Sequence, residues 1–122
     1  MNPAFGVIGL ARKGGLLTMG EEATGAACRA GQAAAVFTAS DISENSLRRA
    51  AHYASVAGVE HFLLSPSKAE LGEICGRESL AMFAVLDVGM ALTIAKRFSS
   101  DEEKLERLQE AVNAARARKK KR

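Results

Sequence analysis

Residues 11–22 read Ala-Arg-Lys-Gly-Gly-Leu-Leu-Thr-Met-Gly-Glu-Glu, and they contain the first change of secondary structure in the chain. The apolar positions before this stretch predict a helix over residues 2–13, which the double glycine Gly14-Gly15 ends. Residues 16–18 predict a short extended segment. A second helix is expected over residues 20–30, so the stretch joins two helices through one short strand.

The start of this second helix is the first candidate binding feature. The first turn of a helix presents unpaired backbone N–H groups and the positive end of the helix dipole. Arg12 and Lys13 lie a few residues before Gly20, which opens the helix. This combination suits an anion such as a phosphate group.

The remainder of the chain alternates between apolar strands and amphipathic helices. Strands are predicted over residues 34–38, 61–64 and 80–86, and helices over residues 43–57, 68–75 and 88–98. Alternation of this kind indicates an α/β fold in three layers, an α-β-α sandwich. With the extended segment near residue 17, the central mixed sheet is expected to have about four short strands.

A boundary is predicted at residues 99–101, after which Ser100 and Glu103 form a capping-box pattern. The following helix, over residues 101–117, has a narrow apolar stripe formed by Leu105, Leu108 and Val112. Such a helix can dock on the domain, pair with a partner or stand free. The sequence thus predicts a domain over residues 1–98 and a C-terminal helix with a basic tail over residues 99–122.

The composition limits the class of protein. The 122 residues are 48% hydrophobic and 25% charged, which is typical of one globular domain. No apolar run is long enough to cross a membrane, and the N-terminus lacks a signal-peptide pattern. Cys28 and Cys75 lie in apolar helical contexts without Cys-x-x-Cys spacing, so buried thiols in a reducing cytoplasm are expected.

The positive net charge belongs to one end of the chain. The formal charge is +3, but residues 116–122 contain six basic side chains and no acidic one. Residues 1–115 therefore contain 11 basic and 14 acidic side chains, a net charge of −3. The tail suits contacts with phosphates that do not read a sequence, or serves only as a solubilising end.

The sequence offers no catalytic cluster, and an enzyme is not expected. His52 and His61 have no partner at the spacing of a metal site or a catalytic triad, and both are interpreted as structural or exposed. Glu21 and Glu22 are adjacent, so they do not form a facing acid–base pair. The glycines match neither a Walker loop nor a dinucleotide fingerprint, so neither a metal nor a cofactor is expected.

The order of these segments resembles the kink-turn-binding ribosomal-protein superfamily typified by archaeal L7Ae, in particular its bacterial YlxQ-like branch. The resemblance covers residues 2–98. The motifs that carry it are Gly-Leu-Ala-Arg-Lys-Gly-Gly at 9–15, Gly-Glu-Glu at 20–22, Ala-Gly-Gln-Ala at 30–33, Ala-Ser-Asp at 39–41 with Ser43 to Asn45, Glu-Leu-Gly at 70–72, and the strand from Ala81 to Asp87. The resemblance implies an α-β-α sandwich that binds RNA without catalysis.

In that family three segments contact RNA: the start of the second helix, the loop after the next strand, and an apolar loop before the last strand, which covers exposed bases. Arg12 and Lys13 match the basic pair of the family. The implied RNA-binding residues in the three segments are Gly20, Glu21, Glu22 and Ala23, then Asp41 and Ile42, and finally Ser79, Leu80, Ala81 and Met82.

The chain departs from the family pattern at the second helix. The Asn-Glu dyad that contacts sheared G·A pairs is replaced by Glu22-Ala23, and a carboxylate can accept a hydrogen bond but cannot donate one. The helix position that is usually basic is Ala26, and Arg29 on the same helix is the candidate substitute. The YlxQ-like branch commonly has glutamate followed by an acid after the glycine, so the change resembles a feature of the branch.

Two hypotheses follow. The first is a small cytoplasmic, monomeric protein that binds structured RNA such as ribosomal RNA and works with ribosomal or translation proteins. The second is a protein-interaction module on the ribosome, whose only RNA affinity is the non-specific attraction of the basic tail.

Overall fold

The computed structural model describes residues 6–120. The elements in chain order are α1 (Gly6–Lys13), β1 (Leu17–Met19), α2 (Glu21–Arg29), β2 (Ala35–Thr38), α3 (Glu44–Ala57), β3 (Glu60–Leu63), α4 (Lys68–Cys75), β4 (Met82–Val85), α5 (Val88–Phe98) and α6 (Glu102–Lys120). The first residues of the predicted N-terminal helix, 2–5, lie outside the described residues.

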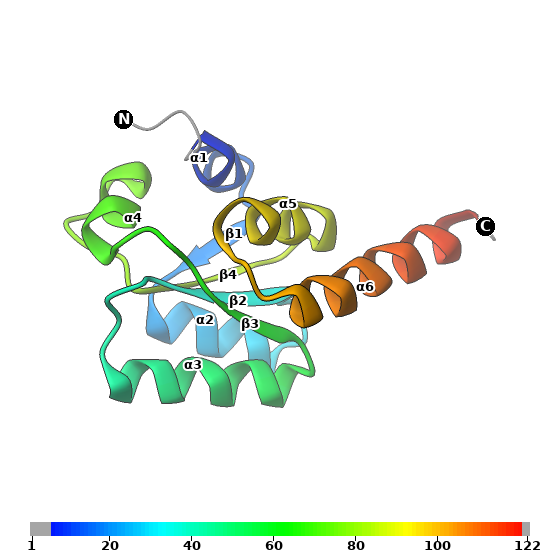
Figure 1. Cartoon of the computed structure of the whole chain (residues 1–122), viewed down its shortest axis with the longest axis horizontal. Helices are drawn as coiled ribbons and strands as arrows, with labels where there is room; N and C mark the ends of the chain where they lie inside the picture. The colour runs from blue at the N-terminus through cyan, green and yellow to red at the C-terminus, as the bar shows by residue number, and fades with distance from the viewer. Residues whose placement is uncertain (1–5, 121–122) are drawn as a thin grey trace.

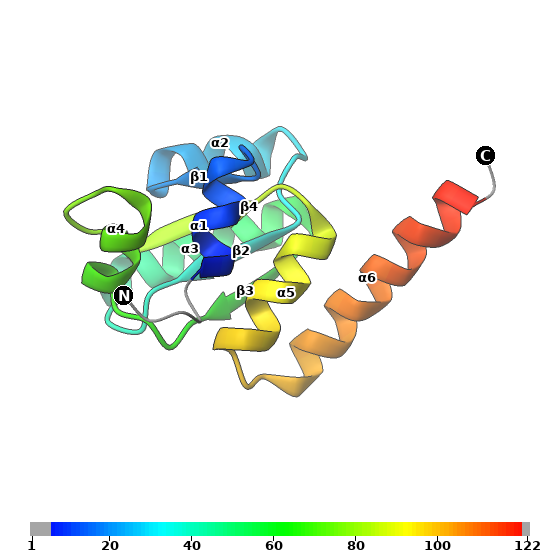
Figure 2. The same cartoon turned by 90° about the horizontal axis from the view of Figure 1, so that it is seen from above.

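The four strands form one mixed sheet in the order β1-β4-β2-β3. Strand β4 pairs antiparallel with both β1 and β2, whereas β2 and β3 are parallel. Helices α2 and α3 cover one face of the sheet, and α1, α4 and α5 cover the other (Figures 1 and 2). The predicted α/β class with a central four-stranded mixed sheet is confirmed.

Alternate side chains of the strands supply two separate cores. Phe37, Phe62 and Phe83 face α1, α4 and α5, and all three are fully buried. The ring of Phe37 stacks between the other two, at centroid distances of 5.5 and 5.3 Å. Val36 and Ala84 point the opposite way, into the core under α2 and α3. This alternation follows from the two-residue period of a strand and fixes the pairing register.

Local signals in the sequence place most helix ends correctly. The side chain of Ser43 caps α3, and Gly58 ends that helix in a left-handed conformation. Ser67 and Glu70 form a reciprocal capping box at the start of α4. The strands are less well placed, since β4 begins at Met82, two residues later than predicted.

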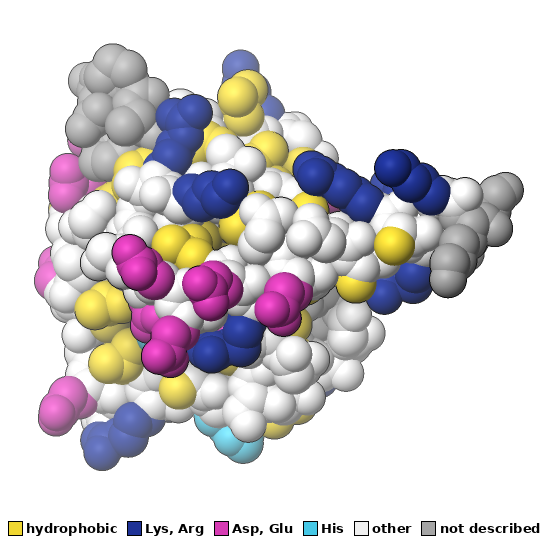
Figure 3. Space-filling model, turned by 45° about the vertical axis from the view of Figure 1, so that its right-hand side comes forward, with side chains coloured by type: hydrophobic (Ala, Val, Ile, Leu, Met, Phe, Trp, Pro, Cys, Tyr) yellow, Lys and Arg dark blue, Asp and Glu magenta, His cyan; other side chains and the backbone are white. Residues whose placement is uncertain are grey.

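Helix α6 docks on the domain through the stripe that the sequence identified. Leu108 and Val112 are buried, and both join the core between the sheet and α5. The last turns of the helix project beyond the body of the molecule (Figure 3). The capping prediction for this helix was wrong, because the carboxylate of Asp101, and not Ser100, accepts the hydrogen bond from the backbone N–H of Lys104, at 3.2 Å.

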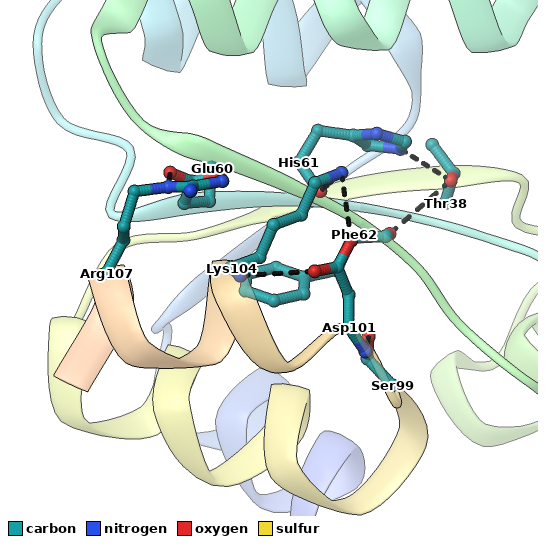
Figure 4. A network of polar contacts seen from close by, with 8 residues as sticks. All are labelled: Thr38, Glu60, His61, Phe62, Ser99, Asp101, Lys104 and Arg107. Carbon is teal, nitrogen blue, oxygen red and sulfur yellow. Dashed lines mark hydrogen bonds and ion pairs between the residues drawn. The ribbon is translucent and has the colours of Figure 1, made fainter.

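Polar contacts attach α6 to the edge strand β3 (Figure 4). Lys104 donates from Nζ to the backbone oxygen of His61 at 2.6 Å. Arg107 forms an ion pair with Glu60, and its Nη2 also donates to Oε2 of that residue at 3.2 Å. The ring of His61 lies within hydrogen-bonding distance of Thr38 on β2, with 2.8 Å between Nε2 and Oγ1.

Candidate nucleic-acid interface

Three segments singled out in the sequence meet at one end of the sheet. Because β1 and β2 both run antiparallel to β4, their last residues lie beside the first residues of β4. The backbone N–H of Gly20, after β1, donates to the oxygen of Met82 at 2.8 Å. That of Ala39, after β2, donates to the oxygen of Ala81 at 2.9 Å. The topology therefore brings the start of α2, the loop after β2 and the approach to β4 to a common edge.

Gly20 is the N-cap residue of α2 and has φ 96° and ψ 166°. Only glycine adopts this conformation readily. No side chain forms a capping hydrogen bond at this end of the helix. The amides of the first turn therefore open onto a shallow depression of about 550 Å³, which is lined by Met19, Gly20, Glu21, Glu22, Ala23, Ala26 and Arg77.

Two arginines from distant segments lie close to residues 75–77, and one of them, Arg77, lines this depression. Arg77 follows α4 and lies against Gly20, where an added Cβ would be 3.4 Å from its Nη1. Arg12, in the last turn of α1, lies against Gly76, where an added Cβ would be 3.6 Å from its Nη2. Within residues 6–120 neither guanidinium forms an ion pair with an acidic side chain, so both charges remain available to an anion.

The thiol of Cys75 lies near both of these arginines. Burial raises its pKa, and the positive charges of Arg12 and Arg77 oppose that rise. Both arginines are therefore close enough to one buried atom to act on it. Lys13, next to Arg12, is exposed at the end of α1.

The two glutamates at the start of α2 have different roles. Oε1 of Glu21 forms an ion pair with Nη1 of Arg49 on α3 at 2.8 Å, so this carboxylate is already partnered. Glu22 is exposed, lines the depression and has no polar side-chain partner within residues 6–120. Of the two, Glu22 is the acceptor that a ligand can reach without breaking an ion pair.

The loop after β2 is anchored to α4. The carboxylate of Asp41 accepts a hydrogen bond from the backbone N–H of Lys68 at 2.8 Å, in the first turn of that helix. Ile42 is half-buried against the core under α2 and α3. This loop lies at the shared edge of the sheet, but Asp41 and Ile42 do not line the depression at Gly20.

The predicted apolar loop before β4 requires a correction. Leu80 and Met82 are each only 2% exposed, because they belong to the cores on opposite faces of the sheet. Their side chains therefore cannot cover an unstacked base in this conformation, and Ala81 between them is half-buried. The exposed residues of this segment are 77–79, Arg-Glu-Ser, which are polar or charged.

Arg29 also lies away from the depression. It occupies the last turn of α2, about 12 Å along the helix axis from Glu21. Its Nη1 folds back toward Gly25, where an added Cβ would be 3.1 Å away. In this arrangement Arg77, which sequence reasoning did not select, contributes the positive charge beside the start of α2.

The remaining titratable groups show no catalytic arrangement within residues 6–120. Burial, and secondarily the charge of Lys104, lowers the pKa of His61 to about 4, so the ring is neutral near pH 7. Cys28 and Cys75 are free and buried, as predicted, and burial raises the pKa of both thiols. No cluster of three or more potential metal ligands occurs in the described chain, and none of its helices has the length and apolarity to span a bilayer.

Comparisons with known proteins found similar chains. The family model described as "Ribosomal protein L7Ae/L30e/S12e/Gadd45 family" matches residues 4–94. The RNA-binding protein YlxQ of Enterococcus faecium is 38% identical over 88 residues, which span 72% of this chain and 84% of that protein. The solved structure of a protein with unknown function from Bacillus halodurans has the same fold, with a TM-score of 0.71 at 21% identity, over 80% of this chain and 97% of that one.

Proposed function

This chain belongs to the ribosomal protein L7Ae/L30e/S12e/Gadd45 family, and we propose that it binds structured RNA through the edge formed by the start of α2 and the residues beside it. The proposed RNA is kink-turn-like, such as a segment of ribosomal RNA, and the proposed setting is translation in the cytoplasm. The protein contributes binding and no chemical step. Support comes from the family match, from the similarity to YlxQ and from the charge at this edge.

In the proposed mode of binding, the positive groups at the edge hold the RNA backbone. The free amides of the first turn of α2 and the guanidinium of Arg77 face one depression. Arg12 and Lys13 lie in the last turn of α1, and the guanidinium of Arg12 lies against Gly76, the residue before Arg77. Backbone amides at a helix start and arginine side chains are both common phosphate ligands, and they position an RNA without reading its bases.

Glu22 is the proposed base-reading residue. Its exposed carboxylate lies in the same depression and can accept a hydrogen bond from a base amino group. Ala23 adds no bulk beside it, so a base edge can approach the helix. Glu21 instead fixes the start of α2 to α3 through Arg49.

One observation carries the proposal. Arg77 lies against Gly20 at the glycine-capped start of α2, and Arg12, from a segment more than 60 residues away in the chain, lies against Gly76, the residue before Arg77. Neither guanidinium has an acidic partner in residues 6–120. An unpaired guanidinium beside uncapped amides, with a second one at the neighbouring Gly76, suits a polyanion.

An electrophoretic shift with a kink-turn RNA tests the proposal, with a second RNA in which the G·A pairs are mutated. The double variant Arg12→Ala/Arg77→Ala should bind the kink-turn RNA at least about tenfold more weakly, because hydrogen bonds to charged groups contribute about 1.5–3 kcal/mol each. The control is Lys96→Ala/Arg97→Ala, which removes the same charge from exposed positions at the end of α5.

Glu22→Ala separates base reading from charge. It should reduce the preference for the kink-turn RNA over the mutated RNA, while the binding of the mutated RNA stays the same or strengthens as a negative charge is lost. Equal binding of both RNAs by the unmodified protein would contradict the proposal and favour non-specific attraction by the C-terminal residues. Binding that Arg12→Ala/Arg77→Ala leaves unchanged would contradict the assigned surface.

A further inference from the structure

The acidic side chains of α6 all lie in its first half, together with the basic Lys104 and Arg107, and the rest of its basic side chains lie at its end. The acidic side chains are Glu102, Glu103, Glu106 and Glu110, and the last five described residues, 116–120, contain Arg116, Arg118, Lys119 and Lys120. We call these four basic residues the α6 tip. All four are exposed, and Figure 3 shows basic side chains on the projecting end and acidic ones nearer the body.

The α6 tip is a continuation of a docked helix. Residues 102–120 form one helix without interruption. Its first part, residues 102–112, which we call the docked root, is held by the buried Leu108 and Val112 and by the contacts of Lys104 and Arg107 with β3. Lys120 lies about 12 Å along the axis beyond Val112. Because an α-helix is stiff over this length, the docked root fixes the direction in which the tip projects.

The α6 tip and the start of α2 lie at opposite ends of the molecule. In Figure 1, whose horizontal direction is the longest axis, α2 begins on the left and α6 leads to the far right. The view from above gives the same separation (Figure 2). An RNA segment at Gly20 is therefore on the other side of the body from the tip.

The groove beside the α6 tip contains one acidic side chain, that of Asp87. Arg116 and Lys119 border a small groove of about 140 Å³ beside the first residues of α5. The carboxylate of Asp87 accepts a hydrogen bond from the backbone N–H of Met90 at 2.8 Å, which orients it without neutralising its charge. Within residues 6–120 none of the four tip side chains forms an ion pair.

We propose that the α6 tip is a second, directionally fixed phosphate-binding surface, which contacts a segment of RNA separate from the one at α2. This inference rests on the proposed function. The partner is RNA and not a lipid surface, because a membrane-binding helix needs a face of large apolar residues and the residues between Val112 and Lys120 include only alanine as apolar side chains. A basic helix with small side chains suits the groove or the backbone of an RNA helix.

The test uses the full-length chain and two kink-turn RNAs, one with short stems and one with a long duplex stem. The first variant, R116A/R118A/K119A/K120A, removes the charge of the tip. The second, Ala114→Pro, keeps the charge but breaks the helix between the docked root and the tip, since proline removes a backbone hydrogen bond and clashes with the preceding turn. Ala114 is exposed, and Ala114→Ser is the matched control that keeps the helix.

Both tip variants should bind the long-stem RNA about tenfold more weakly than the unmodified protein and bind the short-stem RNA equally well. The charge variant should also lower the slope of log affinity against log salt by about 2 to 4, according to the number of phosphates released. If the Ala114→Pro variant binds the long-stem RNA as tightly as the Ala114→Ser variant, the proposal of a directionally fixed surface is wrong. The tip then acts only as a flexible basic end.

The outcomes separate this inference from the proposed function. Arg12→Ala/Arg77→Ala should weaken binding to both RNAs, whereas the tip variants should weaken binding only to the long one. If the tip variants bind both RNAs normally, the inference fails and the proposed function stands. If only the tip variants lose affinity, the α2 surface fails. Tip-dependent binding to phosphatidylserine vesicles, without a tip-dependent effect on RNA, would overturn the choice of partner.

Discussion

Lys104 and His61 are joined across the boundary between the C-terminal helix and the sheet, with 2.6 Å between Nζ of the lysine and the backbone oxygen of the histidine. The lysine lies in the first turn of α6, and the histidine lies on the edge strand β3. This contact also places an ammonium group close enough to the histidine ring to lower its pKa, in addition to the larger effect of burial.

Replacing Lys104 with methionine should weaken this junction. Lys104→Met keeps most of the aliphatic stem but loses the charged hydrogen bond, so we expect the free energy of unfolding to fall by about 1–2 kcal/mol. The pKa of His61 should rise, yet remain below 6.5, because burial is the larger cause of its shift. Urea unfolding and NMR titration of the histidine ring measure the two effects. An unchanged histidine pKa would contradict the electrostatic link, and Lys96→Met serves as the exposed control.

The burial of His61 predicts a dependence of stability on pH. Its pKa is lowered from 6.5 to about 4 in the folded protein, so the unfolded chain binds a proton that the folded protein excludes. Stability should therefore be complete above pH 6.5 and decrease as the pH falls toward 4, by up to about 3 kcal/mol from this group. His61→Gln can keep a hydrogen bond to Thr38 without titrating. Urea unfolding of both proteins at pH 7 and pH 4.5 gives the difference between their free energies of unfolding at each pH. If that difference is the same at both pH values, the titration of His61 does not contribute to the pH dependence of stability.

Gly72 sets the position of the segment that carries Arg77. A Cβ added at Gly72 would lie 2.7 Å from Cα of Ser79 and 2.8 Å from the backbone oxygen of Arg77. Gly72→Ala must therefore displace backbone, and we expect a net loss of about 1–3 kcal/mol despite the better helix propensity of alanine. Gly9→Ala is the control, since its Cβ would meet only Cγ2 of Ile74 at 3.8 Å, and it should stabilise the protein by about 0.5–1 kcal/mol. Thermal unfolding of both variants measures the two changes in stability. Equal changes in the two variants would contradict this prediction.

Gly20 should be essential to the start of α2. Its φ of 96° with ψ of 166° is unfavourable for any other residue, so Gly20→Ala should cost about 1–3 kcal/mol and lower the affinity for a kink-turn RNA. Gly31→Ala is a matched control, because Gly31 also has a positive φ, 71°, but follows the opposite end of α2. It should lose stability without losing RNA affinity. Loss of affinity in both variants, measured where both remain folded, would show that the effect is not local.

Most of the fold could be predicted because its signals are local. Ser43, Gly58 and Gly76 mark helix ends through capping and left-handed backbone conformations, which depend on few neighbouring residues. The alternation of strands and helices then limits the architecture to three layers. Membership of the family, predicted from the order of short motifs, is confirmed by the match over residues 4–94.

The candidate site was less predictable because it is built from tertiary contacts. Nothing in the neighbourhood of Arg77 indicates that its side chain lies beside Gly20, although a basic residue directly after the helix-ending Gly76 is a signal worth testing. Leu80 and Met82 fit both an apolar loop and the start of a buried strand, and the structure buries them. The docking of α6 was left open because a narrow apolar stripe does not identify the surface that it covers.

The position of α6 also bears on self-association. Strand β3 is one of the two edge strands of the sheet, and an uncovered edge can pair with a strand of another molecule. Lys104 engages a backbone oxygen of this strand, and Arg107 forms an ion pair with the side chain of its first residue, Glu60. By covering this edge, α6 prevents it from pairing with a strand of another molecule. A chain ending before residue 101 would expose this edge together with the apolar surface that Leu108 and Val112 cover.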